Sequence, residues 1–104
     1  MKIAIASSGS EPDAEVSQHG ARAPFYLIYS SNGSFQESIA NPYVNSERGA
    51  GPQAAQLLAE QGVKLLVAGD FGGRFIAELE AGGIRQVQQT GIVSNVITEV
   101  LVLV

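Results

Sequence analysis

The segment Val63–Ala68 constrains the fold of this chain more than any other. It is apolar at every position except Lys64, and it lies between two segments with helical spacing of apolar residues. A strand has this composition when both faces of its sheet are covered, as in β–α–β units. The sequence therefore predicts an α/β fold with a buried strand at its centre.

Proline and glycine mark the limits of the two flanking helices. The first helix is expected to begin with Pro52–Gln53, because the N–H that proline lacks would be unpaired in a first turn, and to end at Gly62. The second is expected over Arg74–Ala81, with Gly82–Gly83 as its end. The first helix shows helical spacing at Ala54, Leu57, Leu58 and Gln61.

The front half of the chain has the pattern of antiparallel strands. Ile3–Ile5 is expected to form a short buried strand, and Phe25–Ser30 a second one. Asn32–Gly33 follows directly and predicts a type I′ hairpin turn, in which both central residues have positive φ. Phe35–Ile39 alternates apolar and polar residues and is expected to form the returning strand.

The last third adds a strand and a helix. Ile84–Gln88 is polar enough for a strand at a sheet edge. The valine-rich end is predicted to be helical, because its apolar residues follow helical spacing at Val93, Val96, Ile97, Val100, Leu101 and Val104. The element order predicts a ribonuclease H-like, three-layer fold: a five-stranded mixed sheet with an antiparallel hairpin half, a β–α–β half and about three helices, in one domain spanning residues 1–104.

Composition excludes several classes of function. With 104 residues, 45% of them hydrophobic, the chain can bury one modest core. The net charge of −4 disfavours nucleic-acid binding, and the absence of cysteine excludes thiolate ligands and nucleophiles. The segment Met1–Ala6 lacks the long apolar run of a signal peptide, and Val96–Val104 is too short to cross a bilayer. We therefore expect a cytoplasmic protein without membrane contact.

His19 is the only histidine and the only source of a neutral nitrogen ligand for a metal. From its pattern alone, capping of a loop is the better interpretation, since no partner ligands follow at metal-site spacing. Arg22 lies close to it in the sequence and is one of only six Lys and Arg residues, which makes it a candidate for contact with an anion.

Two glycine-rich turns precede the predicted helices. Gly49–Gly51 leads into the first helix with Gln53 in its first turn, so unpaired N–H groups and the positive end of the helix dipole favour an anion there. Gly69–Arg74 follows the buried strand, where ligands of open α/β sheets usually bind. In the alternative interpretation both turns are plain loops, with Arg74 solvated and Phe71 in the core.

Enzyme classes find little support in the sequence. A ribonuclease H-type nuclease needs carboxylates on its first strand to hold two metal ions, and Lys2–Ala6 contains none. There is also no nucleophile-elbow pattern for a serine hydrolase. We therefore expect a binding protein and not an enzyme.

Six segments in order resemble the dinitrogenase iron–molybdenum cofactor biosynthesis family, which includes cofactor carriers and the molybdenum–copper orange protein. They span nearly the whole chain: Met1–Ile5, Val16–His19, Arg22–Tyr26, Gly49–Leu58, Ala68–Gly72 and Gly82–Ile84. The family usually has His-Phe-Gly-Arg where this chain has His19–Arg22, and Pro-Asn where it has Gly73–Arg74. The resemblance implies reversible binding of an anionic metal–sulfur cluster, of the iron–molybdenum or molybdenum–copper type, by a non-catalytic domain.

By this resemblance His19 is expected to bind a terminal metal of the cluster. The remaining candidate contacts are Arg22, Gly49, Gly51, Gln53, Gly69, Phe71, Gly72 and Arg74. Protein donors or acceptors of the cluster are expected partners, and the chain is expected to be a monomer or a weak homodimer. The alternative is an interaction or regulatory module that keeps the fold and has lost the cluster; the apolar C-terminal helix favours it.

Overall fold

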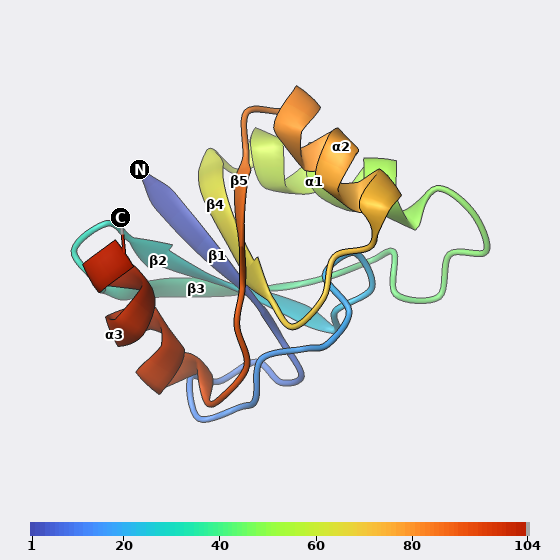
Figure 1. Ribbon diagram of the computed structural model, residues 1–104. Coiled ribbons are helices and arrows are strands. Elements are labelled where there is room, and N and C mark those ends of the chain that lie inside the picture. Colours follow the sequence, from blue (N-terminus) through green and yellow to red (C-terminus); the bar gives the residue numbers. More distant parts are fainter. Residues whose placement is uncertain (104) are drawn as a thin grey trace.

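A computed structural model describes residues 1–103 of the chain. These residues form a five-stranded mixed sheet and three helices (Figure 1). In chain order the elements are β1 (Lys2–Ser7), β2 (Phe25–Ser30), β3 (Phe35–Ala40), α1 (Ala50–Glu60), β4 (Val63–Ala68), α2 (Gly73–Ala81), β5 (Arg85–Gln88) and α3 (Val93–Leu103). No helix in this part of the chain is long and apolar enough to cross a membrane.

The strand order β3-β2-β1-β4-β5 confirms the predicted ribonuclease H-like architecture. β2 pairs antiparallel with both β1 and β3, whereas β4 pairs parallel with both β1 and β5. The polar β5 lies at a sheet edge, as its sequence predicts. Because β1, β4 and β5 run in the same direction, their carboxyl ends meet at one end of the sheet, where α/β proteins usually bind ligands.

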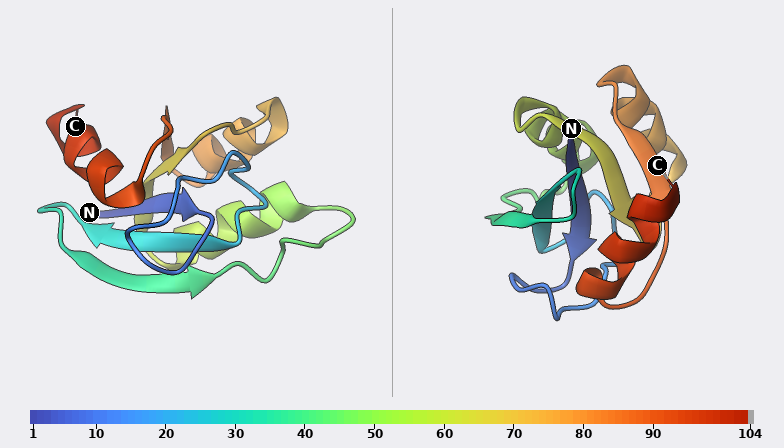
Figure 2. Two further views of the ribbon diagram at one scale, coloured as in Figure 1. Left: turned by 90° about the horizontal axis from the view of Figure 1, so that it is seen from below. Right: turned by 90° about the vertical axis from the view of Figure 1, so that its left-hand side faces the viewer.

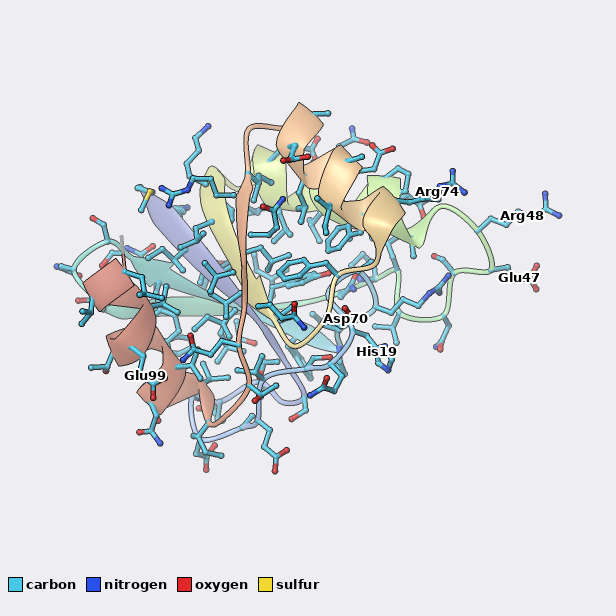
Figure 3. All side chains as sticks on the ribbon, in the orientation of Figure 1. His19, Glu47, Arg48, Asp70, Arg74 and Glu99 are labelled. Carbon is cyan, nitrogen blue, oxygen red and sulfur yellow. The ribbon has the colours of Figure 1, made fainter. Side chains whose placement is uncertain are left out.

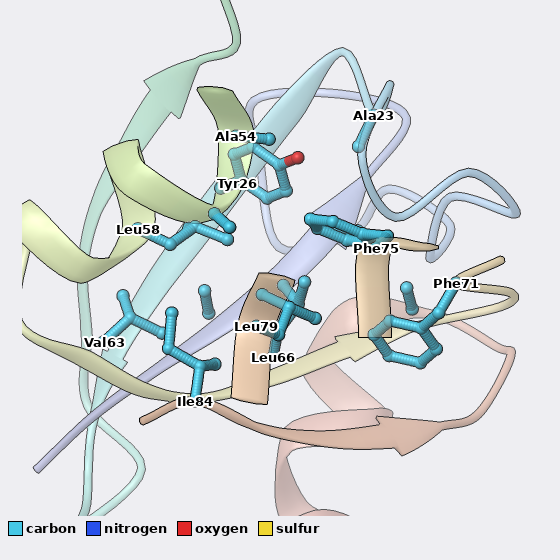
Figure 4. Packing of buried hydrophobic residues seen from close by; sticks show 14 of the residues in the cluster. Ala23, Tyr26, Ala54, Leu58, Val63, Leu66, Phe71, Phe75, Leu79 and Ile84 are labelled. Atoms are coloured by element: carbon cyan, nitrogen blue, oxygen red, sulfur yellow. The ribbon is translucent and has the colours of Figure 1, made fainter. Parts of the chain in front are cut away.

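Helices cover both faces of the sheet and enclose two apolar clusters (Figure 2). Successive side chains of β4 alternate between them: Leu66 packs in the cluster under α1 and α2, and Leu65 in the cluster under α3. Figure 4 shows the first cluster, with Leu58, Leu66, Phe75 and Leu79 interdigitated. Burial of each such leucine contributes about 1.5–3 kcal/mol to folding.

The valine-rich end is helical, as its spacing predicts. Val93, Val96, Ile97 and Val100 are buried on one face of α3; Val104 lies outside the described residues. The main-chain N–H groups of Val93 and Ser94 donate to the carbonyls of Ala14 and Pro12, at 2.9 Å each. The loop before β2 therefore caps the start of this helix.

Two local predictions are wrong. Gly33 has φ +90°, but within residues 1–103 no residue other than glycine has a positive φ, so the β2–β3 turn is not type I′. The Gly33 N–H instead donates to the Ser30 carbonyl, and the Ser30 N–H to the Ser34 carbonyl, as in a three-residue hairpin loop with one left-handed glycine. Helix α1 also begins at Ala50, two residues before Pro52, because the first turn has several N–H groups without intrahelical partners and tolerates proline at more than one position.

The geometry of the turn predicts that Gly33→Ala lowers the stability of the fold. The left-handed backbone strains any side chain, and a Cβ here would lie 2.9 Å from Leu101 Cδ1. We expect urea denaturation to show a loss of about 1–2 kcal/mol. Ser31→Ala in the same turn is the control, and equal stability of the two variants would contradict the assigned geometry.

Candidate functional site

An open depression of about 660 Å³ lies between the segment after His19, the start of α1 and the start of α2. It adjoins the end of the sheet at which β1 and β4 finish. Its lining is Ala21, Arg22, Glu47, Arg48, Gly49, Ala50, Gly51, Pro52, Phe71, Gly72, Gly73, Arg74 and Phe75. We call it the helix-start pocket.

Positive charge is concentrated in the lining of this pocket. Arg22, Arg48 and Arg74 contribute to it, against a single acidic residue, Glu47. The whole chain has only six Lys and Arg residues and a net charge of −4, so half of its side-chain cations line one depression. Arg74 and Arg48 lie on the same side of the molecule as His19 in Figure 3. The local field therefore favours an anion.

Two helix N-termini contribute to the same lining. Gly49 before α1 and Gly72 before α2 have φ values of +74° and +72°, and neither helix has a side-chain cap or an acidic residue in its first turn. The N–H groups of Gln53 and Ile76 bond to the carbonyls of these glycines. The N–H groups before them have no intrahelical acceptor, and with the helix dipoles they favour a bound anion.

The apolar part of the lining comes from Phe71 and Phe75, which stack with ring centroids 6.2 Å apart. Both are buried members of the α1–α2 core, so the core interpretation of Phe71 is confirmed while it also lines the pocket. Gly20 permits this arrangement, because a Cβ there would lie 2.9 Å from the Phe75 ring.

A smaller depression of about 240 Å³ adjoins the pocket and contains His19 and Asp70. It shares Ala21, Arg22, Phe71 and Gly72 with the larger one, so the two form a continuous surface. The His19 side chain is exposed, while its main-chain N–H donates to Ser17 Oγ at 3.1 Å. Residues 1–103 contain no group of three or more His, Cys, Asp or Glu that could hold a metal ion.

Main-chain bonds hold the His19 segment on the ends of the strands. Ser17 N–H donates to the Ala6 carbonyl at 2.8 Å, and Gly20 N–H to the Asp70 carbonyl at 2.9 Å. The buried Tyr26 hydroxyl donates to the Gly20 carbonyl. Burial raises the pKa of this phenol, so the hydroxyl remains protonated as a donor.

Arg22 and Asn41 connect this segment to the loop that precedes α1. Asn41 Nδ2 donates to the carbonyls of Ala21 (3.0 Å) and Ala23 (2.9 Å). Arg22 Nη1 donates to the carbonyls of Val44 (3.3 Å) and Ser46. Part of the Arg22 guanidinium is therefore occupied in positioning the loop that contributes Glu47 and Arg48 to the pocket.

The structure brings together seven of the nine predicted site residues. Gln53 and Gly69 are not in the lining of either depression. Gly69 instead allows close packing, because a Cβ there would lie 2.8 Å from Gln18 Oε1. Gln53 is exposed on the first turn of α1. The seven residues in the lining are His19, Arg22, Gly49, Gly51, Phe71, Gly72 and Arg74.

Sequence reasoning missed several lining residues, chiefly Glu47, Arg48, Gly73 and Phe75. Arg48 had a usable signal, because it is a cation directly before the predicted helix start. Phe75 had none, since its place depends on how α2 packs against the His19 segment.

Fold and pocket together define a ribonuclease H-like α/β domain with a cationic depression at the carboxyl end of its sheet. The sequence model of the dinitrogenase iron–molybdenum cofactor family matches residues 1–102, and the chain belongs to this family. No curated protein sequence matches it.

Solved structures with the same fold include three from named microorganisms. The apo form of the orange protein from Desulfovibrio gigas is 27% identical, with a TM-score of 0.89 over 96% of this chain and 86% of that one. A proposed NifB protein from Thermotoga is 26% identical, with a TM-score of 0.80 over 98% and 87%. A proposed dinitrogenase from Methanocaldococcus jannaschii, 12% identical with a TM-score of 0.61 over 97% and 88%, supports the fold alone.

The Arg22 contacts predict that Arg22→Gln frees the loop before α1. Loss of two charge-assisted bonds to main-chain carbonyls is expected to raise the rate of tryptic cleavage after Arg48 several-fold under native conditions, measured by mass spectrometry. Arg85→Gln, which removes an exposed arginine on β5, is the control. Unchanged cleavage after Arg48 would show that Arg22 does not position the loop.

Proposed function

We propose that the chain binds an anionic metal–sulfur cluster in the helix-start pocket and acts as its carrier. One observation carries this proposal: three arginines and two uncapped helix starts converge on one depression of an otherwise acidic chain. A ligand with several negative charges would interact favourably with all of these groups at the same time. The family and the orange-protein relative support a cofactor-related guest.

The donor set fits a preformed cluster better than a bare metal ion. The chain has no cysteine, and His19 is its only histidine. A bare ion needs several protein ligands, whereas a cluster arrives with its metals already coordinated by sulfide and needs one further ligand and a fitting surface. His19, beside the helix-start pocket, would supply that ligand, and Arg22, Arg74 and main-chain N–H groups would neutralise the sulfides.

Such binding is expected to be reversible and non-catalytic. Arginine and N–H contacts to sulfide exchange more readily than thiolate–metal bonds, and a carrier must release its cargo. The polar groups that line the pocket are mainly cations and main-chain donors, with one carboxylate. This set would stabilise bound negative charge, and we expect it to hold the cluster without acting on it.

A second candidate function is an interaction module. Met1, Phe35, Val102 and Leu103 are 55%, 41%, 83% and 66% exposed. Met1 precedes β1, and the β2–β3 turn lies against Leu101 of α3, so these residues gather at the end of the sheet opposite the pocket (Figures 1 and 2). Exposed apolar side chains of this size favour contact with another protein.

Anaerobic incubation with tetrathiomolybdate, followed by gel filtration and metal analysis, tests the carrier proposal. We expect molybdenum to elute with the wild-type protein and Arg74→Ala to weaken its retention about tenfold, through loss of a charge-assisted contact. Arg85→Ala removes the same charge away from the pocket and should retain the anion. No molybdenum with the wild type would contradict the proposal and favour the interaction module.

The role of His19 has its own test. His19→Ala is expected to lower retention of an iron–molybdenum–sulfur cluster, because the cluster loses its only protein ligand to a metal, while the far-ultraviolet circular dichroism of this exposed-residue variant stays unchanged. Gln56→Ala, at an exposed position of α1 outside the lining of both depressions, is the control. Equal retention by both variants would remove His19 from the site.

A further inference from the structure

Two glycines of the helix-start pocket lie outside the left-handed backbone region. Gly51 and Gly73 lie in the first turns of α1 and α2 and both line the pocket. Neither has a positive φ, in contrast to the preceding Gly49 and Gly72, whose left-handed backbones favour glycine. Any residue could adopt the backbone geometry of Gly73, whereas Gly51 directly precedes Pro52, whose ring disfavours a helical conformation for a residue with a Cβ.

Packing does not require glycine at these positions either. A Cβ on Gly73 would meet no atom within 4 Å, and one on Gly51 would lie 3.8 Å from Phe75 Cδ1, an ordinary contact distance. The chain does contain glycines that packing demands, such as Gly20, where a Cβ would lie 2.9 Å from the Phe75 ring. No close contact of this kind with the rest of the fold explains the glycines at positions 51 and 73.

Glycine at a position whose backbone alanine can also adopt lowers stability relative to alanine, because the unfolded chain with glycine has more conformational freedom. Gly73 incurs this cost at a position that lines the depression, without a conformational or packing requirement for glycine. Residues that break a local rule of stability without a folding reason are expected at functional sites. The space that a methyl group would occupy at Gly51 is beside Phe75, within the pocket lining.

We propose that the bound anion lies directly against the main chain of Gly51 and Gly73, and that these two glycines determine which ligands fit. This inference rests on the proposed function and narrows it. The ligand class is a compact polyatomic anion with sulfur or oxygen acceptors on opposite sides, broad enough to reach both helix starts. Side chains at either glycine would keep such an anion away from the N–H groups that bind it.

Gly51→Ala and Gly73→Ala separate this proposal from a structural role. Gly73→Ala is expected to raise Tm by about 2–6 °C, because alanine restricts the unfolded chain. In Gly51→Ala the clash with the ring of Pro52 opposes such a gain. Each is also expected to weaken tetrathiomolybdate binding about tenfold or more in an anaerobic titration followed by absorbance. Gly82→Ala is the matched control, since Gly82 has a negative φ, ordinary surroundings for a Cβ and a place outside the pocket.

Higher Tm with weaker binding in Gly73→Ala, weaker binding in Gly51→Ala, and unchanged affinity in Gly82→Ala would support the proposal. Unchanged affinity in either pocket variant overturns the contact at that glycine while the carrier function stands. A lower Tm in Gly73→Ala would assign that glycine a folding role and also overturn its part of the proposal. If the wild type itself fails to bind tetrathiomolybdate, the proposed function fails and this inference fails with it.

Discussion

Every helix begins with main-chain N–H groups that need acceptors outside the helix, and these groups are treated differently at the start of α3 than at the starts of α1 and α2. The carbonyls of Pro12 and Ala14 accept hydrogen bonds from the first N–H groups of α3, so this helix start is capped by another segment of the chain. The starts of α1 and α2 have no side-chain cap and line the pocket instead. The position of the pocket, its preference for anions and its glycine content all depend on this difference.

The sequence predicts the fold well because the deciding signals are local. The apolar run of β4, the glycine ends of α1 and α2 and the helical spacing of α3 each identify an element without knowledge of its neighbours. The hairpin shows the limit of such signals: Asn32–Gly33 identifies a turn correctly, yet its type depends on strand register, which the pair alone does not determine.

The candidate site is predictable where its residues directly follow strands or precede helices. The glycine turns satisfy this condition, because one follows β4 and both precede helices. His19 and Arg22 lie instead in the loop between β1 and β2, which main-chain bonds to Ala6 and Asp70 hold at the same end of the sheet. Phe75 and the hydrogen bonds of Arg22 to Val44 and Ser46 depend on contacts between distant segments, so spacing along the chain does not indicate them. Gly69 shows the converse, since its place in a glycine-rich turn serves packing against Gln18.

The separation of the pocket from the exposed apolar residues has a consequence for the order in which the protein can bind a ligand and a protein partner. The pocket adjoins the carboxyl ends of β1 and β4, whereas the start of β1, the β2–β3 turn and the end of α3 lie toward the opposite end of the sheet (Figure 1). In the proposed carrier, a protein bound to that opposite end would leave the cationic pocket facing solvent, so the cluster and the partner would not compete for the same surface. The proposed transfer would then not require that one partner leave before the next arrives.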